Sequence, residues 1–245
     1  MYRYKLIVEY NGTPFCGWQR QSGVLTVQQC LEEAVQPLTK DLVLINGAGR
    51  TDTGVHALGQ VAHFETDKLL DAFRVQECMN AHLAELPISV LSVEQVDKNF
   101  HSRFSAVERY YIYKIVNRRS KLALDINRAW KVLKPLNEEK MNKVAQILVG
   151  KHDFSAFRAT GCQSNSPVKT LNSISVERFS DQVIVKLAAK SFLYHQVRNI
   201  VGSLQKVGTG EWSVDKFQEV FESKDRTQAA ATAPACGLYF WKVRY

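Results

Sequence analysis

The sequence predicts an α+β protein made of two ferredoxin-like halves, with antiparallel or mixed sheets joined across a central cleft. The main observation is the order of elements, strand–helix–strand–strand–helix–strand, which occurs twice along the 245 residues. The second is composition: 45% of the residues are hydrophobic and 23% are charged, as in ordinary globular proteins. No low-complexity linker interrupts either half.

The first half begins with a strand at 2–10, in which Tyr4, Leu6, Val8 and Tyr10 alternate onto one face. The other predicted elements of this half are strands at 42–46, 60–65 and 88–96 and a helix at 69–84.

A further helix of the first half follows Thr26. Thr26 and Gln29 have the spacing of a capping box, in which each residue satisfies a backbone N–H of the first turn. Apolar residues then recur at helical spacing (Val27, Leu31, Ala34 and Leu38).

The second half repeats this order. A helix at 137–148 is expected to end at Gly150, and a second helix at 194–206 has an apolar side. Ser213 is predicted to cap one extra helix. The predicted strands of this half are 109–116, 171–178, 183–188 and 238–245. The halves are expected to meet near 101–105, which predicts domains at 1–104 and 105–245.

The bulk properties favour a cytoplasmic protein with a polyanionic partner. The net charge of +8 attracts phosphates, although many basic proteins bind no nucleic acid. Five scattered cysteines with no CxxC spacing argue against a disulfide framework or a zinc knuckle. The first residues do not resemble a signal peptide, and no apolar run is long enough to cross a membrane.

A glycine-rich loop at 47–57 is the most informative segment. Its glycines allow positive φ and close approach to a ligand, so the loop can present Arg50 and Asp52 on a tight turn. Without further information, a hairpin connection in which Asp52 caps the turn is the more common role for such residues. The loop lacks the phosphate-binding pattern G-x-x-x-x-G-K-[ST].

Metal binding is a second alternative for this loop. Asp52, His56 and His63 are candidate ligands, but the sequence places no carboxylate cluster beside them to complete a coordination shell. The pair His152 and Asp153 also lacks a second group nearby in the sequence. We therefore predict no metal site.

The loop at 47–60, GAGRTDTGVHALGQ, resembles the signature loop of the TruA family of tRNA pseudouridine synthases. The similarity extends in order over nearly the whole chain, through further blocks at 10–21, 100–113, 151–154, 162–164, 191–202 and 233–238. This resemblance implies the pseudouridine synthase fold, with RNA bound in the cleft between the halves.

The resemblance also implies a reaction that needs no cofactor. The uridine glycosidic bond is cleaved, and the uracil is rotated and rejoined to the sugar through carbon. Matched by position, Asp52 is the catalytic carboxylate. Attack on the base, attack on the sugar and removal of a sugar proton remain open as its role. Each route needs an ionised carboxylate in a site that excludes water, where desolvation would raise its pKa.

Two residues of the second half complete the implied site. Arg198 matches the family arginine expected to hold Asp52 in its charged form, since a guanidinium can bind a carboxylate by two hydrogen bonds. Tyr111 matches a tyrosine that can stack on the uracil or transfer a proton. Alternation puts Tyr111 and Tyr113 on one face of their strand. Core packing is the alternative role for Tyr110 and Tyr113, and a surface position is the alternative for Arg198.

The resemblance implies a tRNA substrate, namely the anticodon stem-loop at positions 38–40, and a homodimer in which each tRNA contacts both subunits. The target base must leave its stack, and Arg50 matches the residue expected to assist that step. The residues predicted to contact phosphates, or else to form a solvated surface, are Arg20, Arg103, Arg118, Arg119, Arg158 and Lys169.

Three residues depart from the family pattern. Asn11 stands where Asp is common, Thr53 where Ala is usual and Gln196 where Met is usual. None of these removes a charged catalytic group, so activity is still expected.

Two other functions remain open. An RNA-binding protein on the same fold would use the basic loops and Tyr111 without needing Asp52. A metal-dependent phosphoesterase would use Asp52, His56 and His152. The presence of Asp52, Tyr111 and Arg198 favours the isomerase, and the missing acidic cluster disfavours the phosphoesterase.

Overall fold

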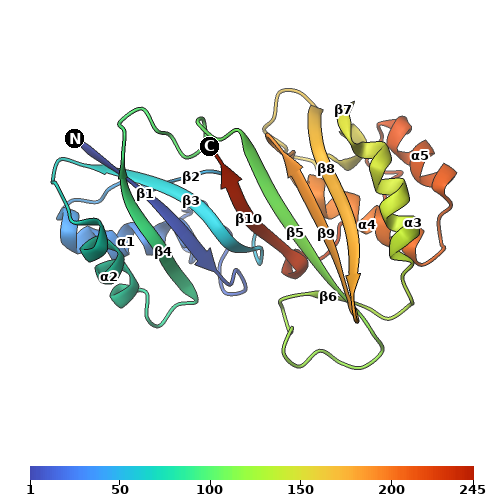
Figure 1. Ribbon diagram of the computed structural model, residues 1–245, viewed down its shortest axis with the longest axis horizontal. Coiled ribbons are helices and arrows are strands. Elements are labelled where there is room, and N and C mark those ends of the chain that lie inside the picture. The colour runs from blue at the N-terminus through green and yellow to red at the C-terminus, as the bar shows by residue number, and fades with distance from the viewer. The chain divides into compact units, whose positions relative to one another are not determined.

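The computed structural model describes residues 1–245 and contains ten strands and five α-helices (Figure 1). The predicted α+β class is confirmed. The chain forms two compact units. The first comprises Met1–Val107 together with Tyr239–Tyr245, and the second comprises Glu108–Leu238.

The sheet of the first unit has the strand order β4-β1-β3-β10. Strand β1 (Tyr2–Tyr10) runs antiparallel to both β3 (His56–Thr66) and β4 (Ile88–Val96), as its residue pairs show. Strand β10 (Leu238–Arg244) is parallel to β3, with Tyr239 opposite His56. This pairing places the last strand in the first unit, whereas the predicted division at 104/105 assigned it to the second half.

The predicted strand at 42–46 is wrong, because only Asn46–Gly47 (β2) pairs with β3. The backbone N–H of Ile45 donates to the buried carboxylate of Glu32 rather than to a neighbouring strand. Leu42 and Leu44 are mostly exposed, so their apolar character does not reflect a buried sheet face.

Two helices, α1 (Val27–Thr39) and α2 (Ala72–His82), pack against each other, and α2 packs on β4 (Figure 1). The predicted face of β1 is confirmed, because Tyr4, Leu6, Val8 and Tyr10 are all buried. The other fully buried residues of this core include Leu31, Val35, Val75 and Met79.

The predicted capping box at the start of α1 is wrong. Thr26 is the N-cap residue, but its side chain makes no capping hydrogen bond, and its buried Oγ1 has no partner. Gln29 instead donates to Glu33, 2.8 Å away on the helix surface. The first turn is held by main-chain bonds from Val27 and Gln28 to the carbonyls of residues 17 and 18.

The sheet of the second unit has the order β5-β9-β8-β7, and all neighbouring strands in this series are antiparallel. The strands are β5 (Glu108–Asn117), β7 (Gly150–Asp153), β8 (Val168–Phe179) and β9 (Gln182–Ala189). A short strand, β6 (Trp130–Val132), pairs in parallel with the end of β5. The sequence did not predict β6 or β7, because both are too short to show a periodic pattern.

Three helices belong to the second unit: α3 (Glu138–Ala145), α4 (Gln196–Gly208) and α5 (Val214–Ser223). Helix α3 packs on β8 and contacts both α4 and α5 (Figure 1). The chain continues past α3 into a 3₁₀ turn at Gln146–Leu148, and Gly150, with φ of +113°, begins β7. The predicted cap of α5 is confirmed, since Ser213 accepts a hydrogen bond from the N–H of Lys216.

No helix in the structure combines the length and the apolar character that crossing a membrane requires.

His63 on β3 is a buried histidine whose surroundings oppose protonation. Burial, the neighbouring His101 and the charge of Arg3 lower the pKa of His63 to about 4, while Glu65 acts in the opposite direction. The N–H of Ser102 donates to Nδ1 of His63 at 3.2 Å, and the Ser102 hydroxyl lies 2.8 Å from the same atom. The neutral ring therefore suits this site.

We expect this site to make the folded state less stable below neutral pH. The folded pKa lies below the unfolded value of 6.5, so the unfolded chain binds the proton first as the pH falls. Between pH 7 and pH 5 we expect the free energy of unfolding to fall by about 2 kcal/mol because of His63. Urea unfolding at both pH values measures it, with His63→Asn as the comparison. An equal pH dependence in the two proteins would contradict the assignment.

Candidate active site

The loop that carries Asp52 is fixed at its base by the first unit. A Cβ on Gly47 would lie 2.6 Å from the ring of Trp18, so the indole packs directly on the loop backbone. The N–H of Ala48 donates to the carbonyl of Val61 at 2.7 Å. The side-chain amide of Gln60 donates to the carbonyl of Gly49 at 2.8 Å. These contacts hold the start of the loop against β3.

Thr51, next to Asp52, is anchored on both its main chain and its side chain. Its carbonyl accepts from the N–H of Trp18 at 3.0 Å, and its hydroxyl lies 2.8 Å from the hydroxyl of Tyr10. Burial raises the pKa of the Tyr10 phenol, so this hydroxyl stays protonated at physiological pH. Thr51, which precedes the candidate carboxylate, is thus held through both its main chain and its side chain.

Asp52 opens a tight turn. Its main-chain carbonyl accepts from the N–H of Val55 at 3.1 Å, and Gly54 within the turn has φ of +75°. The turn is therefore closed by the backbone of Asp52. Asp52 itself is half-buried.

Arg50 lies two residues before Asp52 on the exposed side of the loop. Its Nε donates to Oε1 of Gln19 at 3.1 Å. Arg20 forms an ion pair of 2.8 Å with Glu32, whose carboxylate is almost fully buried. Gln28 connects the two pairs, because it accepts from Gln19 at 2.7 Å and donates to Glu32 at 3.1 Å.

The histidines considered as metal ligands have other partners. Nδ1 of His56 accepts from the N–H of Gly12 at 2.9 Å, and its ring stacks on Tyr239. His63 contacts Ser102, as described above. His152, in the second unit, lies 2.9 Å through Nε2 from the carbonyl of Val149. No group of three His, Cys, Asp or Glu side chains in the structure is arranged to hold a metal ion.

Tyr111 and its neighbours lie on β5 of the second unit. Tyr111 is 9% exposed, and its ring packs edge-on against Phe192 with centroids 5.0 Å apart. Tyr113 is a core residue: it is fully buried, and its hydroxyl donates to the carbonyl of Pro234 at 2.7 Å. Tyr110 is half-buried and donates to Glu108. Of these two tyrosines, Tyr113 is therefore the one that packs in the core.

Arg198 lies in the first turns of α4 and is held by the segment at 229–234. Its Nε donates to the carbonyl of Ala233 at 2.8 Å, and the N–H of Ala233 donates back to the carbonyl of Arg198 at 3.2 Å. The side chain is half-buried.

The segment at 229–234 is itself clamped onto α4. Arg226 donates to the carbonyl of Ala230 at 3.0 Å and to the side chains of Asn199 and Thr232 at 3.1 Å and 3.0 Å. The approach is close, because a Cβ on Gly202 of α4 would lie 2.1 Å from the carbonyl of Ala231. The carbonyl that holds Arg198 therefore has a fixed position.

The sequence reasoning missed this clamp, although α4 carries a signal for it. Gln196, Asn199 and Ser203 are spaced by three and four residues and are all buried. Buried polar side chains need hydrogen-bond partners, so a line of them at helical spacing on an apolar face indicates that another polar segment packs against the helix.

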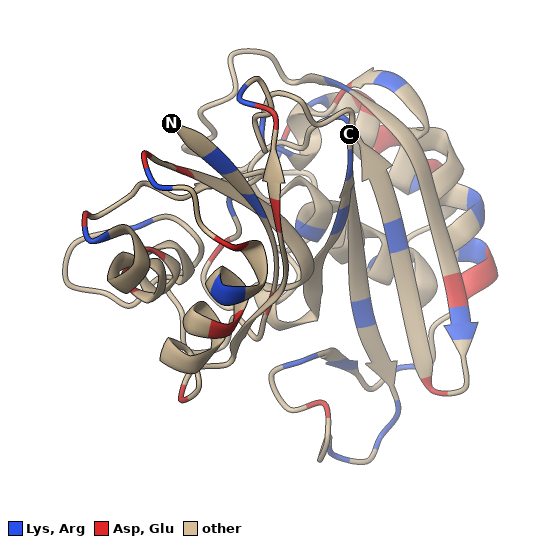
Figure 2. Ribbon diagram, turned by 60° about the vertical axis from the view of Figure 1, so that its left-hand side comes forward, with Lys and Arg blue, Asp and Glu red and all other residues tan.

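The predicted phosphate contacts lie in several loops. Arg103 is exposed and packs over the ring of Phe104. Arg118 pairs with Asp181 at 2.8 Å, and Arg119 beside it is exposed. The loop between β5 and β6 that contains these two arginines shows several basic positions in Figure 2.

Arg158 and Lys169 converge on one loop of the second unit. Arg158 donates to the carbonyls of Cys162 and Ser164, and Lys169 contacts the hydroxyl of Ser164 at 2.9 Å. Both side chains are half-buried. Arg158 therefore has a structural task within this loop.

The residues that depart from the family pattern have local roles. The side chain of Asn11 accepts from both the N–H and the hydroxyl of Thr13, which forms a turn directly after β1. Gln196 is buried and accepts from the N–H of Leu193 at 2.8 Å, just before α4 begins. Thr53 is exposed.

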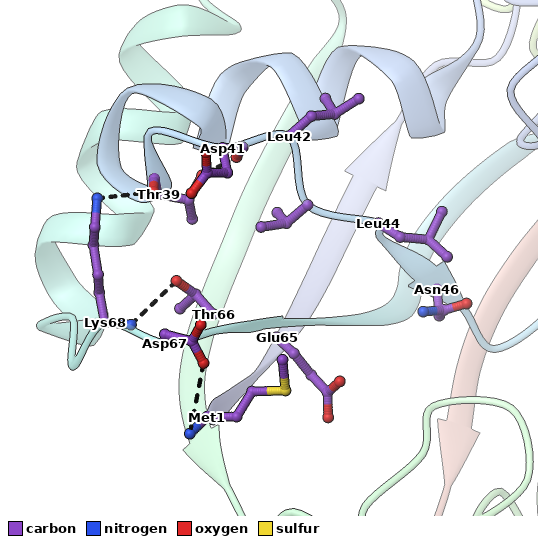
Figure 3. Close-up of a pocket in the computed structure, with 11 residues that line it drawn as sticks. Met1, Thr39, Asp41, Leu42, Leu44, Asn46, Glu65, Thr66, Asp67 and Lys68 are labelled. Atoms are coloured by element: carbon purple, nitrogen blue, oxygen red, sulfur yellow. Dashed lines mark hydrogen bonds and ion pairs between the residues drawn. The ribbon is translucent and has the colours of Figure 1, made fainter.

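A pocket of about 380 Å³ lies at another place on the first unit, between the end of α1 and the end of β3 (Figure 3). Lys68 lines it and donates to the carbonyl of Thr39 at 2.8 Å, while Leu42 and Leu44 are exposed beside it. None of the residues predicted to act on RNA lines this pocket.

Comparison with known proteins connects this geometry to a family. A sequence model of the family described as tRNA pseudouridine synthase matches residues 6–105 and 144–245, which include Arg50, Asp52 and Arg198. The chain belongs to this family. Tyr111 lies outside the matched ranges.

Three relatives of this synthase extend the match to the full chain. Each is named tRNA pseudouridine synthase A, and each aligns over all 245 residues. The protein of Afipia carboxidovorans is 51% identical over its whole length. Those of Rhodospirillum rubrum and Paramagnetospirillum magneticum are 49% and 50% identical over 88% and 96% of their lengths. The predicted resemblance is confirmed, and the synthase is an isomerase that acts on tRNA.

Gly17 tests how closely the Asp52 loop is held. Its φ is +83°, and a Cβ there would lie 2.5 Å from the carbonyl of Thr51. We expect Gly17→Ala to lower the free energy of unfolding by about 3 kcal/mol through the left-handed conformation and the clash together. Gly23→Ala is the control, because its φ is +77° and nothing lies within 4 Å. That variant should lose only about 1 kcal/mol in urea unfolding; equal losses would contradict the close approach.

Proposed function

We propose that this synthase converts uridine to pseudouridine in the anticodon stem-loop of tRNA, at positions 38–40, with Asp52 as the catalytic carboxylate. The observation that carries the proposal is the position of Asp52 in a chain of this family: the loop backbone is bonded to Trp18 and Val61, and the Thr51 hydroxyl is bonded to Tyr10. Because such a loop is already ordered, it loses little conformational entropy when RNA binds to its carboxylate.

The overall reaction is an isomerisation and needs no co-substrate. The N1–C1′ bond of the nucleotide breaks, the uracil rotates, a C5–C1′ bond forms, and the proton at C5 is removed while N1 gains one. Asp52 starts the cleavage, by attack on the base, by attack on the sugar or by removing a sugar proton. All three routes use the ionised carboxylate, and none assigns a step to a cofactor.

Arg198 and Tyr111 are the proposed partners of Asp52. A guanidinium can bind a carboxylate by two hydrogen bonds, and the bond from Nε of Arg198 to the carbonyl of Ala233 limits the movement of this group. Tyr111 offers an aromatic ring for stacking on the uracil and a hydroxyl for proton transfer. These roles rest on family membership and on the chemistry of the side chains.

Arg50 is the proposed aid to base extrusion, and its exposed position on the loop suits contact with RNA. The residues proposed to contact phosphates are Arg20, Arg103, Arg118, Arg119, Arg158 and Lys169. The net charge of +8 supports a polyanionic substrate. We further propose that the enzyme acts in the cytoplasm as a homodimer, which the resemblance to the family suggests.

Asp52→Asn tests the catalytic assignment. The substitution keeps the shape of the side chain and removes its charge, so we expect turnover on unmodified tRNA to fall at least about 1,000-fold. Binding of tRNA should change less than about two-fold, since the basic surface is intact. Mapping of pseudouridine in total tRNA from cells carrying either form gives the position as well. Pseudouridine at wild-type levels with Asp52→Asn would reject Asp52 as the catalytic group.

A chelator separates this reaction from metal-dependent hydrolysis. We expect the enzyme to keep full activity after treatment with EDTA and gel filtration, because every proposed step uses a side chain of the protein. The assay uses tRNA folded in monovalent salt, so that the RNA itself does not depend on magnesium. Loss of activity that zinc or magnesium restores would instead support the metal-dependent alternative.

A further inference from the structure

We propose that Gln19 is a positioning residue for Arg50, and that Gln28 and Glu32 set the orientation of its amide. The residues concerned, Glu32, Gln28, Gln19 and Arg50, are called the amide relay below. The inference rests on the proposed role of Arg50 in base extrusion and extends it to the residues bonded behind Arg50.

The relay begins at a buried carboxylate. Glu32 is 1% exposed, and a charge in that position requires a partner on each oxygen. Oε2 accepts from Arg20 at 2.8 Å. Oε1 accepts from the N–H of Ile45 and from Nε2 of Gln28, both at 3.1 Å. The carboxylate therefore faces the amide nitrogen of Gln28.

Gln28 has its hydrogen-bonding capacity fully used, and only one orientation of its amide is possible. Its Nε2 faces the carbonyl of Ile45 at 3.0 Å, which can only accept. Its Oε1 faces the main-chain N–H of Arg20 at 2.8 Å, which can only donate. A flipped amide would place two acceptors together at one end and two donors together at the other.

This orientation determines that of Gln19. Oε1 of Gln28 accepts from Nε2 of Gln19 at 2.7 Å, so the amide nitrogen of Gln19 must point inward. Its oxygen then points outward, where it accepts from Nε of Arg50 at 3.1 Å. Nε of arginine can only donate, so the polarity agrees at both ends of the relay.

The consequence is a guanidinium oriented before RNA binds. Nε lies at the inner end of the group, and a bond there restricts rotation of a long, flexible side chain on the protein surface. Arg50 would then enter the space left by an extruded base without first losing its own conformational freedom.

A double-mutant cycle tests the relay, with turnover measured on two RNA stem-loops. One has the target uridine paired in the stem, and the other has it opposite a mismatched base, which lowers the cost of extrusion. We expect Arg50→Ala to lower kcat/KM about 10-fold or more on the paired substrate and clearly less on the mismatched one. Gln19→Ala should show the same preference with a loss of about three- to ten-fold, and the double variant should be no worse than Arg50→Ala alone.

Gln29→Ala is the matched control. Gln29 neighbours Gln28 on α1, has the same side chain and bonds only to Glu33 on the helix surface. We expect this variant to match the wild type on both substrates. Thermal unfolding of every variant separates loss of fold from loss of positioning.

Three results would overturn the inference: wild-type turnover by Gln19→Ala on the paired substrate, equal losses on both substrates, or multiplied losses in the double variant. Gln28→Met, which keeps the length and removes the polarity, should resemble Gln19→Ala, and a folded Gln28→Met variant with wild-type turnover would also count against the relay. If it does not fold, Gln19→Ala decides alone. A wild-type enzyme that forms no pseudouridine on either RNA would reject the proposed function instead.

Discussion

The carboxylate of Glu32 is buried, and the chain around the candidate active site is arranged to satisfy it. It holds the N–H of Ile45 just before the Asp52 loop, the guanidinium of Arg20 and the amide of Gln28. Removing one partner of a buried charge costs more than the bond itself contributes, because the remaining charge stays without solvent. This one group therefore links helix α1 to the segment just before the loop, through Ile45, and to the separate segment that carries Arg20. It also explains why Ile45 is not part of the sheet, since its N–H bonds to Glu32 and its carbonyl bonds to Gln28.

Both candidate catalytic segments are held by the main chain of a neighbouring segment. In the first unit, Trp18 donates its N–H to the carbonyl of Thr51, beside Asp52. In the second unit, Arg198 and Ala233 exchange two hydrogen bonds, and Arg226 holds the segment that carries Ala233. Such contacts do not depend on the identity of the side chain at the holding position. They place a reactive group with little freedom, which is what transition-state stabilisation by fixed charges requires.

Burial shifts the pKa values of several groups that support the candidate site. It raises the pKa values of Tyr10 and Tyr113 and lowers that of Arg226. Each of these side chains has hydrogen-bond partners that compensate its burial, such as the carbonyl of Pro234 for Tyr113. The polar groups of the interior thus serve to fix loops and segments in place. The proposed function draws on a residue at the surface, Arg50, which another interior group, Gln19, contacts.

The sequence by itself determined the long elements and the family. Periodic apolar residues placed β1, β4 and α4 closely, Ser213 marked the start of α5, and the motif around Asp52 identified the synthase family. Only the tertiary structure showed that 42–46 is not a strand and that β10 pairs with β3 in the first unit. It alone connected Gln19 and Gln28 to Arg50. The physical reason is that periodicity reports which face of an element is buried. Edge pairing and buried polar networks depend instead on partners that are distant in sequence. A single buried carboxylate, such as that of Glu32, can bind a backbone N–H that would otherwise pair with a strand.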